Sequence, residues 1–451
     1  MNKQLKKRHI QMIALGGAIG TGLFFGSAKS IQMTGPSIVL SYIFGGIVLF
    51  IIMKALGEMT VHRPNTGAYT QYAHAYIGPY AGFISGWNAW FEYTVVCMVE
   101  LTAITFFLDL WVTSVPHWLI CLVLLLIFAA INLMSVRLFG EFEFWFAGIK
   151  IFAIIAMLAF TAYLVIFKHG LNPEFGTYFS EKILFSHGLE GFAFSLVIVM
   201  FSFGGTEFVS IAAGNAENPD KTIPSAINGV VVRILLFYVF TMIAIMMLYP
   251  YEQLSGDISP FVDVFLKVGL SSAALVMNIV AITAALSSFN SSLFSASRLL
   301  ANLAENGNAP KRLSTLSKNG IPKRSVIFTS LCVMVAVIVN FIFPQKAIMY
   351  LLTVATCSIL VTWFIILITQ MYFRKRQVLK KFPIKFRLRF FPYTNIFACI
   401  ILFLVLGIMT QMEDMKTSVY ITPLWILALS FCYILKKTNI INTIIDDKKD
   451  E

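Results

Sequence analysis

Charged side chains are scarce in this sequence. Asp, Glu, Lys and Arg make up only 12% of its 451 residues, whereas hydrophobic residues make up 58%. Soluble globular domains carry about 25% charged residues, because their surfaces face water. The composition therefore excludes a soluble globular protein and predicts a chain that crosses the membrane many times.

The sequence also lacks clusters of residues for metal binding, disulfide bonding or catalysis. The six cysteines lie in apolar stretches without paired spacing, so they predict neither a disulfide framework nor a metal site. There is no paired-aspartate motif, no His/Glu metal constellation and no Ser/His/Asp set. Five histidines lie in predicted loops or at span ends, namely His62, His74, His117, His169 and His187. We therefore expect a protein that is not an enzyme and that uses no cofactor or metal.

No cleavable leader is predicted at the N-terminus. Residues 1–9 are short and basic, but the apolar run after them has no small-residue cleavage site. A second apolar run follows at once. We expect the first run to remain in the protein as a membrane span.

Apolar runs long enough to cross a bilayer recur along the whole chain. About 20 consecutive apolar residues form one spanning helix. The predicted fold class is therefore an all-α membrane protein with about twelve transmembrane helices. The expected spans lie near residues 11–33, 36–57, 81–109, 117–136, 146–167, 188–213, 225–249, 260–299, 325–343, 347–372, 392–411 and 420–436.

Positive charges are distributed unevenly between the two sides of such a bundle. If the chain alternates from a cytoplasmic N-terminus, the cytoplasmic segments contain 24 Lys and Arg residues and the outer segments only four. Cytoplasmic loops carry an excess of these residues. We therefore expect a plasma-membrane protein with both termini in the cytoplasm and no nucleic-acid partner. The basic run 374–389 fits this topology, and contact with anionic lipid is the alternative.

The first apolar run is rich in glycine. Five of the eleven residues 16–26 are glycine, inside the uncharged stretch 10–28. Glycine holds a helix poorly but permits unwinding and close approach of a bound group. Unwound backbone survives in a membrane only where protein buries it or where it lines a wet cavity. These residues predict an interrupted helix whose N–H and C=O groups suit a small zwitterion.

A second apolar run is interrupted in the same way. Residues 201–207 read Phe-Ser-Phe-Gly-Gly-Thr-Glu and lie in the sixth expected span. The two interruptions head two sets of five spans, 11–167 and 188–372, as in inverted-repeat transporters. The last two spans, 392–436, carry no intramembrane charge and are expected at the periphery. Close helix packing through small residues is the alternative for each interruption taken alone.

Three ionisable residues are expected inside the membrane. Glu92 and Glu100 lie in the third span, where they could line one cavity, and Lys150 lies about one turn into the fifth. Such residues serve binding, coupling or a structural ion pair. The alternatives are an interhelical hydrogen bond for Glu100 and a side chain that reaches the interface for Lys150. The serines of 287–292 are expected to pack helices, with a pore-lining role as the alternative.

A series of motifs follows one order over about three quarters of the chain. They are Gly-Gly-Ala-Ile-Gly-Thr-Gly-Leu-Phe at 16–24, Ala-Leu-Gly-Glu-Met at 55–59, Gly-Trp-Asn at 86–88, Glu-Leu-Thr-Ala at 100–103, the segment 201–207, Glu-Asn-Pro at 217–219, Ser-Arg at 297–298 and Ala-Pro-Lys at 309–311. In these motifs the chain resembles bacterial amino-acid permeases of the amino acid, polyamine and organocation superfamily. The resemblance is to the branch of aromatic amino-acid, proline, lysine and 4-aminobutyrate permeases.

The resemblance implies two inverted five-helix repeats with interrupted helices one and six, two further helices, and alternating access. It assigns the substrate carboxylate to backbone groups of Ile19, Gly20, Thr21 and Gly22, and the substrate ammonium to those of Phe201, Ser202, Phe203 and Gly204. Glu100 and Glu207 are expected to surround the substrate or to support its binding residues. Half-helix N-termini attract anions and unwound carbonyls attract cations, which agrees with this assignment.

In relatives, a lysine of the fifth span stands where sodium-coupled members bind sodium, and Lys150 matches it. The resemblance therefore implies that H⁺ is the coupling ion, because a lysine desolvated by burial can exchange its proton. Two positions depart from the family pattern. Asn215 replaces an acid, so one cytoplasmic ion pair would be absent. Glu92 has no counterpart and is a candidate for specificity, conceivably toward a cationic side chain.

We therefore expect a secondary active transporter that imports an amino acid by proton symport. An exchanger, a nutrient receptor that does not transport, and a membrane enzyme are the alternatives. The chain shows no soluble signalling domain and no catalytic set, which disfavours the last two. Glu92 and Glu100 favour a cationic substrate, whereas the aromatic-rich third and sixth spans suit a bulky neutral side chain. No obligatory protein partner is expected.

Overall fold

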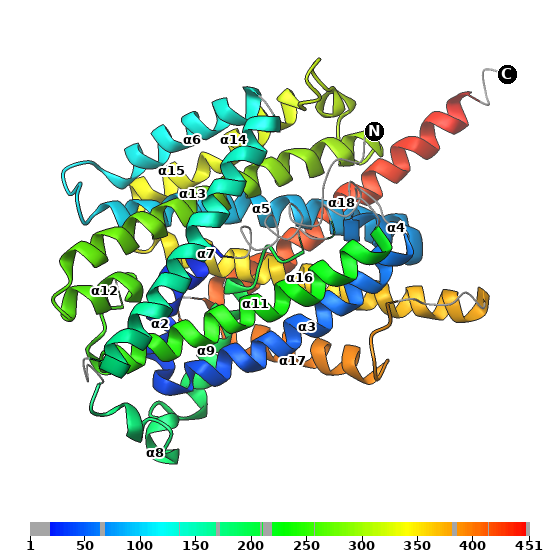
Figure 1. Ribbon diagram of the computed structural model, residues 1–451. Coiled ribbons are helices and arrows are strands. Elements are labelled where there is room, and N and C mark those ends of the chain that lie inside the picture. Colours follow the sequence, from blue (N-terminus) through cyan, green and yellow to red (C-terminus); the bar gives the residue numbers. More distant parts are fainter. Residues whose placement is uncertain are drawn as a thin grey trace.

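The computed structural model of the protein describes residues 19–447, except 64–67, 135, 168–171, 208–209, 211–218, 257, 381–385 and 414. Within this part of the chain every element of regular structure is a helix. The long helices lie side by side in one bundle, and α18 extends beyond it toward the C-terminus (Figure 1). The predicted all-α fold class is confirmed.

The expected spans are present as apolar helices. Among the described residues, eight helical segments are long and apolar enough to cross a membrane, and three shorter apolar helices accompany them. The first of the eight, Gly22–His62, contains two expected spans, because Gly35 and Pro36 turn the chain within it. Within the described residues the helices therefore correspond to the expected spans, apart from the run 260–299.

Residues 19–167 form one continuous series of helices. In chain order they are η1 (Gly22–Gly26), α2 (Ser27–Thr34), η2 (Gly35–Ser37), α3 (Ile38–His62), α4 (Ala68–Tyr76), α5 (Pro79–Leu108), α6 (His117–Met134) and α7 (Val136–Phe167). The short α4 lies between the two longer helices α3 and α5.

The rest of the chain repeats the pattern of long helices and short connections. In chain order the helices are η3 (Phe175–Thr177), α8 (Glu181–Leu184), α9 (Gly188–Ser202), α11 (Pro219–Leu248), η5 (Tyr251–Gln253), α12 (Pro260–Lys267), α13 (Ser271–Glu305), η6 (Lys311–Ser314), α14 (Lys323–Val333), α15 (Val335–Ile342), α16 (Ala347–Lys380), α17 (Tyr393–Met409) and α18 (Lys416–Asp447).

Two expected spans differ in detail from the structure. The run 260–299 forms α12 and α13, because the chain turns where Gly269 adopts a φ of +83°. This left-handed conformation ends a helix and favours glycine. The prediction of one helix over 260–299 is therefore wrong. The run 325–343 is a single spanning segment that breaks at Met334 into α14 and α15.

Helix α5 holds a central place in the bundle. It packs against α13 along one side, against α16 along another, and against α4 and α6 near its ends. Helices α3 and α11 pack together, and α9 packs against α2 and α3. In Figure 1, α6, α14 and α15 lie together at one edge of the bundle, and α3, α9 and α17 lie at the opposite edge.

The outer surface of the bundle is strongly apolar. Phe152, Phe341 and Leu424, on three different helices, are 74%, 68% and 63% exposed. Water disfavours such exposure of many large apolar side chains, whereas lipid acyl chains accept it. This surface is that of a multi-pass membrane protein.

A buried ion pair connects α3 to α16. Nε and Nη2 of Arg374 each donate a 2.6 Å hydrogen bond to the Glu58 carboxylate, one to each oxygen. The backbone N–H of Leu388 donates to the same carboxylate at 2.8 Å, and its carbonyl accepts from Arg374 at 2.7 Å. The pair therefore fastens α3, α16 and the segment before α17 to one another.

Candidate functional site

The two interrupted helices approach each other closely inside the bundle. Helix η1 follows the non-helical residues Ile19 and Gly20, and α9 ends at Ser202, where a turn replaces the helix. A Cβ atom on Gly22 would lie 2.6 Å from the Cα atom of Ser202. Only glycine permits two backbones to approach this closely. Residues 16–18 of the first expected interruption lie outside the described residues.

A small cavity lies between these helix ends and α5. Its volume is about 20 Å³, room for about one water molecule but not for an amino acid. The cavity is lined by Gly20, Gly22, Glu92, Tyr93, Val96, Glu100, Phe201, Ser202, Gly204, Gly205, Ser288, Ser292 and Ile359. The structure therefore brings both glutamates of α5 to one cavity with the glycines of both interruptions.

Glu100 lies at the N-terminal end of η1. The backbone N–H of Thr21 donates a 3.4 Å hydrogen bond to Oε1 of Glu100. A Cβ atom on Gly20 would lie 2.6 Å from the same oxygen. Backbone N–H groups at the start of a helix attract anions. A carboxyl group of the protein itself thus occupies the place that the resemblance gives to the substrate carboxylate.

The carbonyl groups at the end of α9 already accept hydrogen bonds within the protein. The carbonyl of Phe201 accepts from the N–H of Gly204 at 2.9 Å. That of Ser202 accepts from the hydroxyl of Tyr238, on α11, at 2.8 Å. A carbonyl oxygen has two lone pairs, so each retains one for a further donor.

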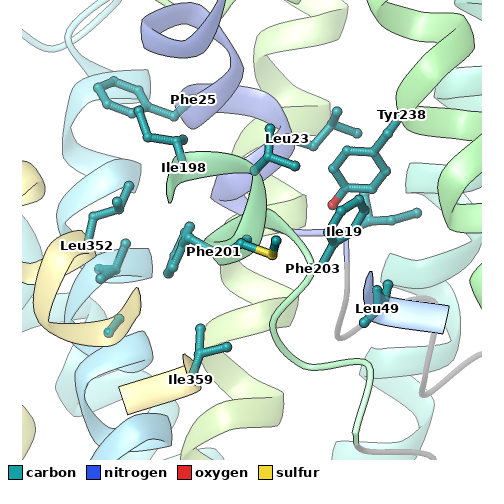
Figure 2. Close-up of a cluster of buried hydrophobic side chains, with 14 of the residues drawn as sticks. Ile19, Leu23, Phe25, Leu49, Ile198, Phe201, Phe203, Tyr238, Leu352 and Ile359 are labelled. Atoms are coloured by element: carbon teal, nitrogen blue, oxygen red, sulfur yellow. The ribbon is translucent and has the colours of Figure 1, made fainter. Parts of the chain in front are cut away.

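The two phenylalanines of the second interruption point in different directions. Phe201 lines the cavity, and Figure 2 shows it above Ile359 of α16. Phe203 is fully buried, and its ring centroid lies 5.5 Å from that of Tyr238. Ile19 lies beside these two rings (Figure 2). Phe201 is therefore placed to cover a bound molecule, whereas the Phe203 side chain belongs to the hydrophobic core.

Lys150 is completely buried, with 0% of its surface exposed. Its ammonium group interacts electrostatically with the carboxyl groups of Glu143, also on α7, and of Glu100 on α5. The hydroxyl of Ser287, on α13, donates to Oε2 of Glu143 at 3.0 Å. The alternative interpretation required the Lys150 side chain to reach the membrane interface, but the side chain is buried inside the bundle. It is connected through Glu100 to the cavity.

Glu92 and Glu207 lie beside each other at another side of the cavity. The two carboxyl groups interact electrostatically. The hydroxyl of Thr362, on α16, donates to Oε2 of Glu92. The backbone N–H of Gly205 donates to Oε1 of Glu207 at 3.2 Å. Glu92 lines the cavity, and Glu207 supports both Glu92 and the turn after α9.

Sequence reasoning missed several residues of this site. Glu143 lies before the expected fifth span, although its spacing of seven from Lys150, about two helical turns, places both on one helix face. Ser288 and Ser292 line the cavity, which favours the alternative interpretation of these two serines. Asn215 lies outside the described residues.

The polar groups of the cavity are carboxyl, hydroxyl and backbone groups. Among the described residues, no group of three or more His, Cys, Asp or Glu side chains is arranged to hold a metal ion. The six cysteines are free thiols. Backbone N–H and C=O groups beside acids and hydroxyls form a set that suits a small zwitterion.

The sequence matches known proteins over nearly its full length. Residues 9–445 match the model of a family described as amino acid permease. The chain is 40% identical over 437 residues to the uncharacterized amino acid permease YtnA of Bacillus subtilis (strain 168), an alignment that covers 96% of this chain and 94% of the relative.

Two further relatives are aromatic amino acid transport proteins. The chain is 39% identical over 439 residues to AroP of Escherichia coli (strain K12) and 40% identical over 439 residues to AroP of Salmonella typhimurium (strain SL1344). Each alignment covers 97% of this chain and 96% of the relative.

Proposed function

Because the chain belongs to the amino acid permease family, we propose that it carries an amino acid across the bacterial plasma membrane as a secondary active transporter. The family and the relatives are permeases, so the protein is a transporter and not an enzyme. The observation that carries the proposal is the cavity at the junction of two interrupted helices. Such junctions bind substrate in transporters built from discontinuous helices.

The substrate backbone would bind across this junction. Its carboxylate takes the N–H groups at the start of η1, where Glu100 now accepts from Thr21. Its ammonium takes the free lone pairs of the carbonyls of Phe201 and Ser202. The positive end of η1 and the negative end of α9 favour this orientation.

Binding requires the lining groups to move apart. The cavity holds about one water molecule, so an amino acid enters only when helix ends or side chains withdraw. A site that must open for its substrate supports alternating access, in which the cavity opens to one side of the membrane at a time.

Proton coupling is assigned to Lys150. The lysine is buried, and its neighbour Glu100 also holds the end of η1. Loss of the lysine proton removes the positive charge that interacts with Glu100. A proton at this site therefore changes the charge around the carboxyl group that the substrate must displace. Charge movements of this kind inside the membrane couple ion binding to transport.

The proposed topology places both termini in the cytoplasm. It rests on the excess of Lys and Arg in the segments on that side. In this orientation α4 and the Glu58–Arg374 pair lie near the cytoplasmic surface. The proposed division into repeats 11–167 and 188–372 places one interrupted helix at the head of each.

Reconstituted protein tests the proposal. Proteoliposomes are given a labelled amino-acid mixture with each common amino acid and 4-aminobutyrate as competitors; the AroP relatives make aromatic amino acids one class to examine. We expect net uptake into vesicles that contain no amino acid. Uptake only into preloaded vesicles would identify an exchanger, and binding without uptake would identify a receptor.

A further inference from the structure

The scheme above gives no role to a pair of acids beside the cavity. Glu92 and Glu207 are 1% and 0% exposed, and their carboxyl groups are close enough to interact electrostatically. Two buried carboxylates side by side repel each other. We therefore expect the pair to share one proton and to carry one negative charge.

Polar but uncharged groups surround this pair. Thr362 of α16 donates to Glu92, and the backbone N–H of Gly205 donates to Glu207. Tyr69 of α4 and Tyr93 of α5 are the other titratable groups that interact with both carboxyl groups. In the part of the chain that the structure describes, neither acid takes part in an ion pair. A buried negative charge without a cation is costly, so a positively charged partner would be favoured here.

The separation between Glu92 and the proposed site for the substrate carboxylate sets the length that a positively charged side chain would need. Glu92 precedes Glu100 by eight residues on α5, which corresponds to about 12 Å along the helix. Both residues line the same cavity, and Glu100 marks the end where the substrate carboxylate is proposed to bind. If the substrate carboxylate binds near Glu100, a charged group that contacts Glu92 must lie at the end of a long substrate side chain.

We propose that the Glu92–Glu207 pair is a side-chain subsite that selects amino acids with a long cationic side chain, such as lysine or arginine. When the cation binds between the acids, the shared proton leaves to the solvent. The charge of the subsite then stays at minus one, since one positive charge replaces another. This inference rests on the proposed function and develops the specificity role that the sequence suggests for Glu92.

Binding to the purified protein tests the inference with pairs of ligands that differ in charge. Isothermal titration calorimetry compares lysine with norleucine, and arginine with citrulline. We expect the cationic member of each pair to bind at least about tenfold more tightly. Titration in buffers of different ionisation enthalpy should show release of about one proton with lysine and none with norleucine.

Glu92→Gln removes the charge and keeps the shape of the side chain. We expect lysine affinity to fall by about tenfold or more while norleucine affinity changes by less than about threefold. The retained norleucine binding shows that the variant is folded. Glu190→Gln, at an exposed acid near the start of α9, is the matched control and should leave both affinities unchanged.

The outcomes separate this inference from the proposed function. Equal lysine preference in wild type and Glu92→Gln, or lysine binding without proton release, would overturn the subsite. Wild-type protein that binds norleucine or an aromatic amino acid better than lysine also overturns it, even if Glu92→Gln does not fold. Failure to bind or transport any amino acid would instead reject the proposed function.

Discussion

The backbone N–H of Thr21 donates to the carboxyl group of Glu100 over 3.4 Å, so an acid of the protein occupies the helix end that we propose for the substrate carboxylate. In this proposal, substrate binding is an exchange of one carboxyl group for another at the same donors. Two carboxylates at one helix end repel each other. Protonation of Glu100 removes that repulsion, which links the entry of a proton to the entry of the substrate.

Replacement of Glu100 by Gln should separate binding from accumulation. The amide carries no charge, so we expect substrate to bind as tightly as in wild type or up to about tenfold more tightly. Because the amide has no charge on which Lys150 or a proton can act, accumulation driven by a pH gradient should be lost. Equilibrium binding and uptake into proteoliposomes measure the two effects. Much weaker binding would show that Glu100 holds the substrate directly and would contradict the exchange.

Gly22→Val should abolish substrate binding. The added Cβ atom would lie 2.6 Å from the Cα atom of Ser202. A backbone atom cannot move away to relieve this clash, as the end of a flexible side chain could. The two helix ends would be forced apart and the donors at η1 displaced. Gly407→Val on α17 is the control, because a Cβ atom there meets nothing within 4 Å. Binding by the Gly22 variant at wild-type affinity would rule out the junction as the site.

The Glu58–Arg374 pair should stabilise the fold much more than a surface pair. Arg374→Leu leaves the Glu58 carboxylate buried without its partner, at a cost of about 3–5 kcal/mol. We expect a clearly lower melting temperature in detergent, and a double variant with Glu58→Leu that loses less than the sum of the single changes. Asp109→Asn breaks a half-exposed pair with His117 and should cost less than about 1 kcal/mol. Additive effects at Glu58 and Arg374 would show that the two residues act independently.

Lys150→Ala should retain exchange and lose accumulation. The substrate groups at the junction remain, so labelled substrate should still equilibrate with unlabelled substrate inside vesicles. Without the charge of Lys150 beside Glu100, the substrate site no longer follows the proton of the lysine, and uptake against a gradient should fall by about tenfold or more. Glu252→Gln, at an exposed acid of η5, is a control with no expected effect. A variant that still concentrates substrate under a pH gradient would remove the coupling role of Lys150.

The two helix interruptions could be predicted because they break a strong local pattern. Glycines within 16–26, and two glycines and an acid within 201–207, stand out in runs that are otherwise apolar. The turn at Gly269 carries the same kind of signal, but one glycine among apolar residues is also common inside membrane helices. For this reason α12 and α13 were not separated by the sequence pattern.

Pairings between distant helices could not be predicted from local pattern. Arg374 belongs to a basic run that indicates topology, and nothing near it in sequence points to Glu58, 316 residues away. Glu143 was missed because an apolar window excludes the charged turn at the start of α7. The proposed exchange of the Glu100 carboxyl group for the substrate carboxylate at Thr21 depends on where the Glu100 side chain lies. A hydropathy pattern does not describe side-chain positions.

The most direct test of the account is the movement of protons when substrate is added. Proteoliposomes containing a pH-sensitive dye are held without a pH gradient and given the substrate that the competition assay identifies. The account predicts that the interior of wild-type vesicles becomes acidic as substrate enters, and that Lys150→Ala vesicles show no such change. Substrate entry into wild-type vesicles at constant internal pH would contradict proton-coupled import.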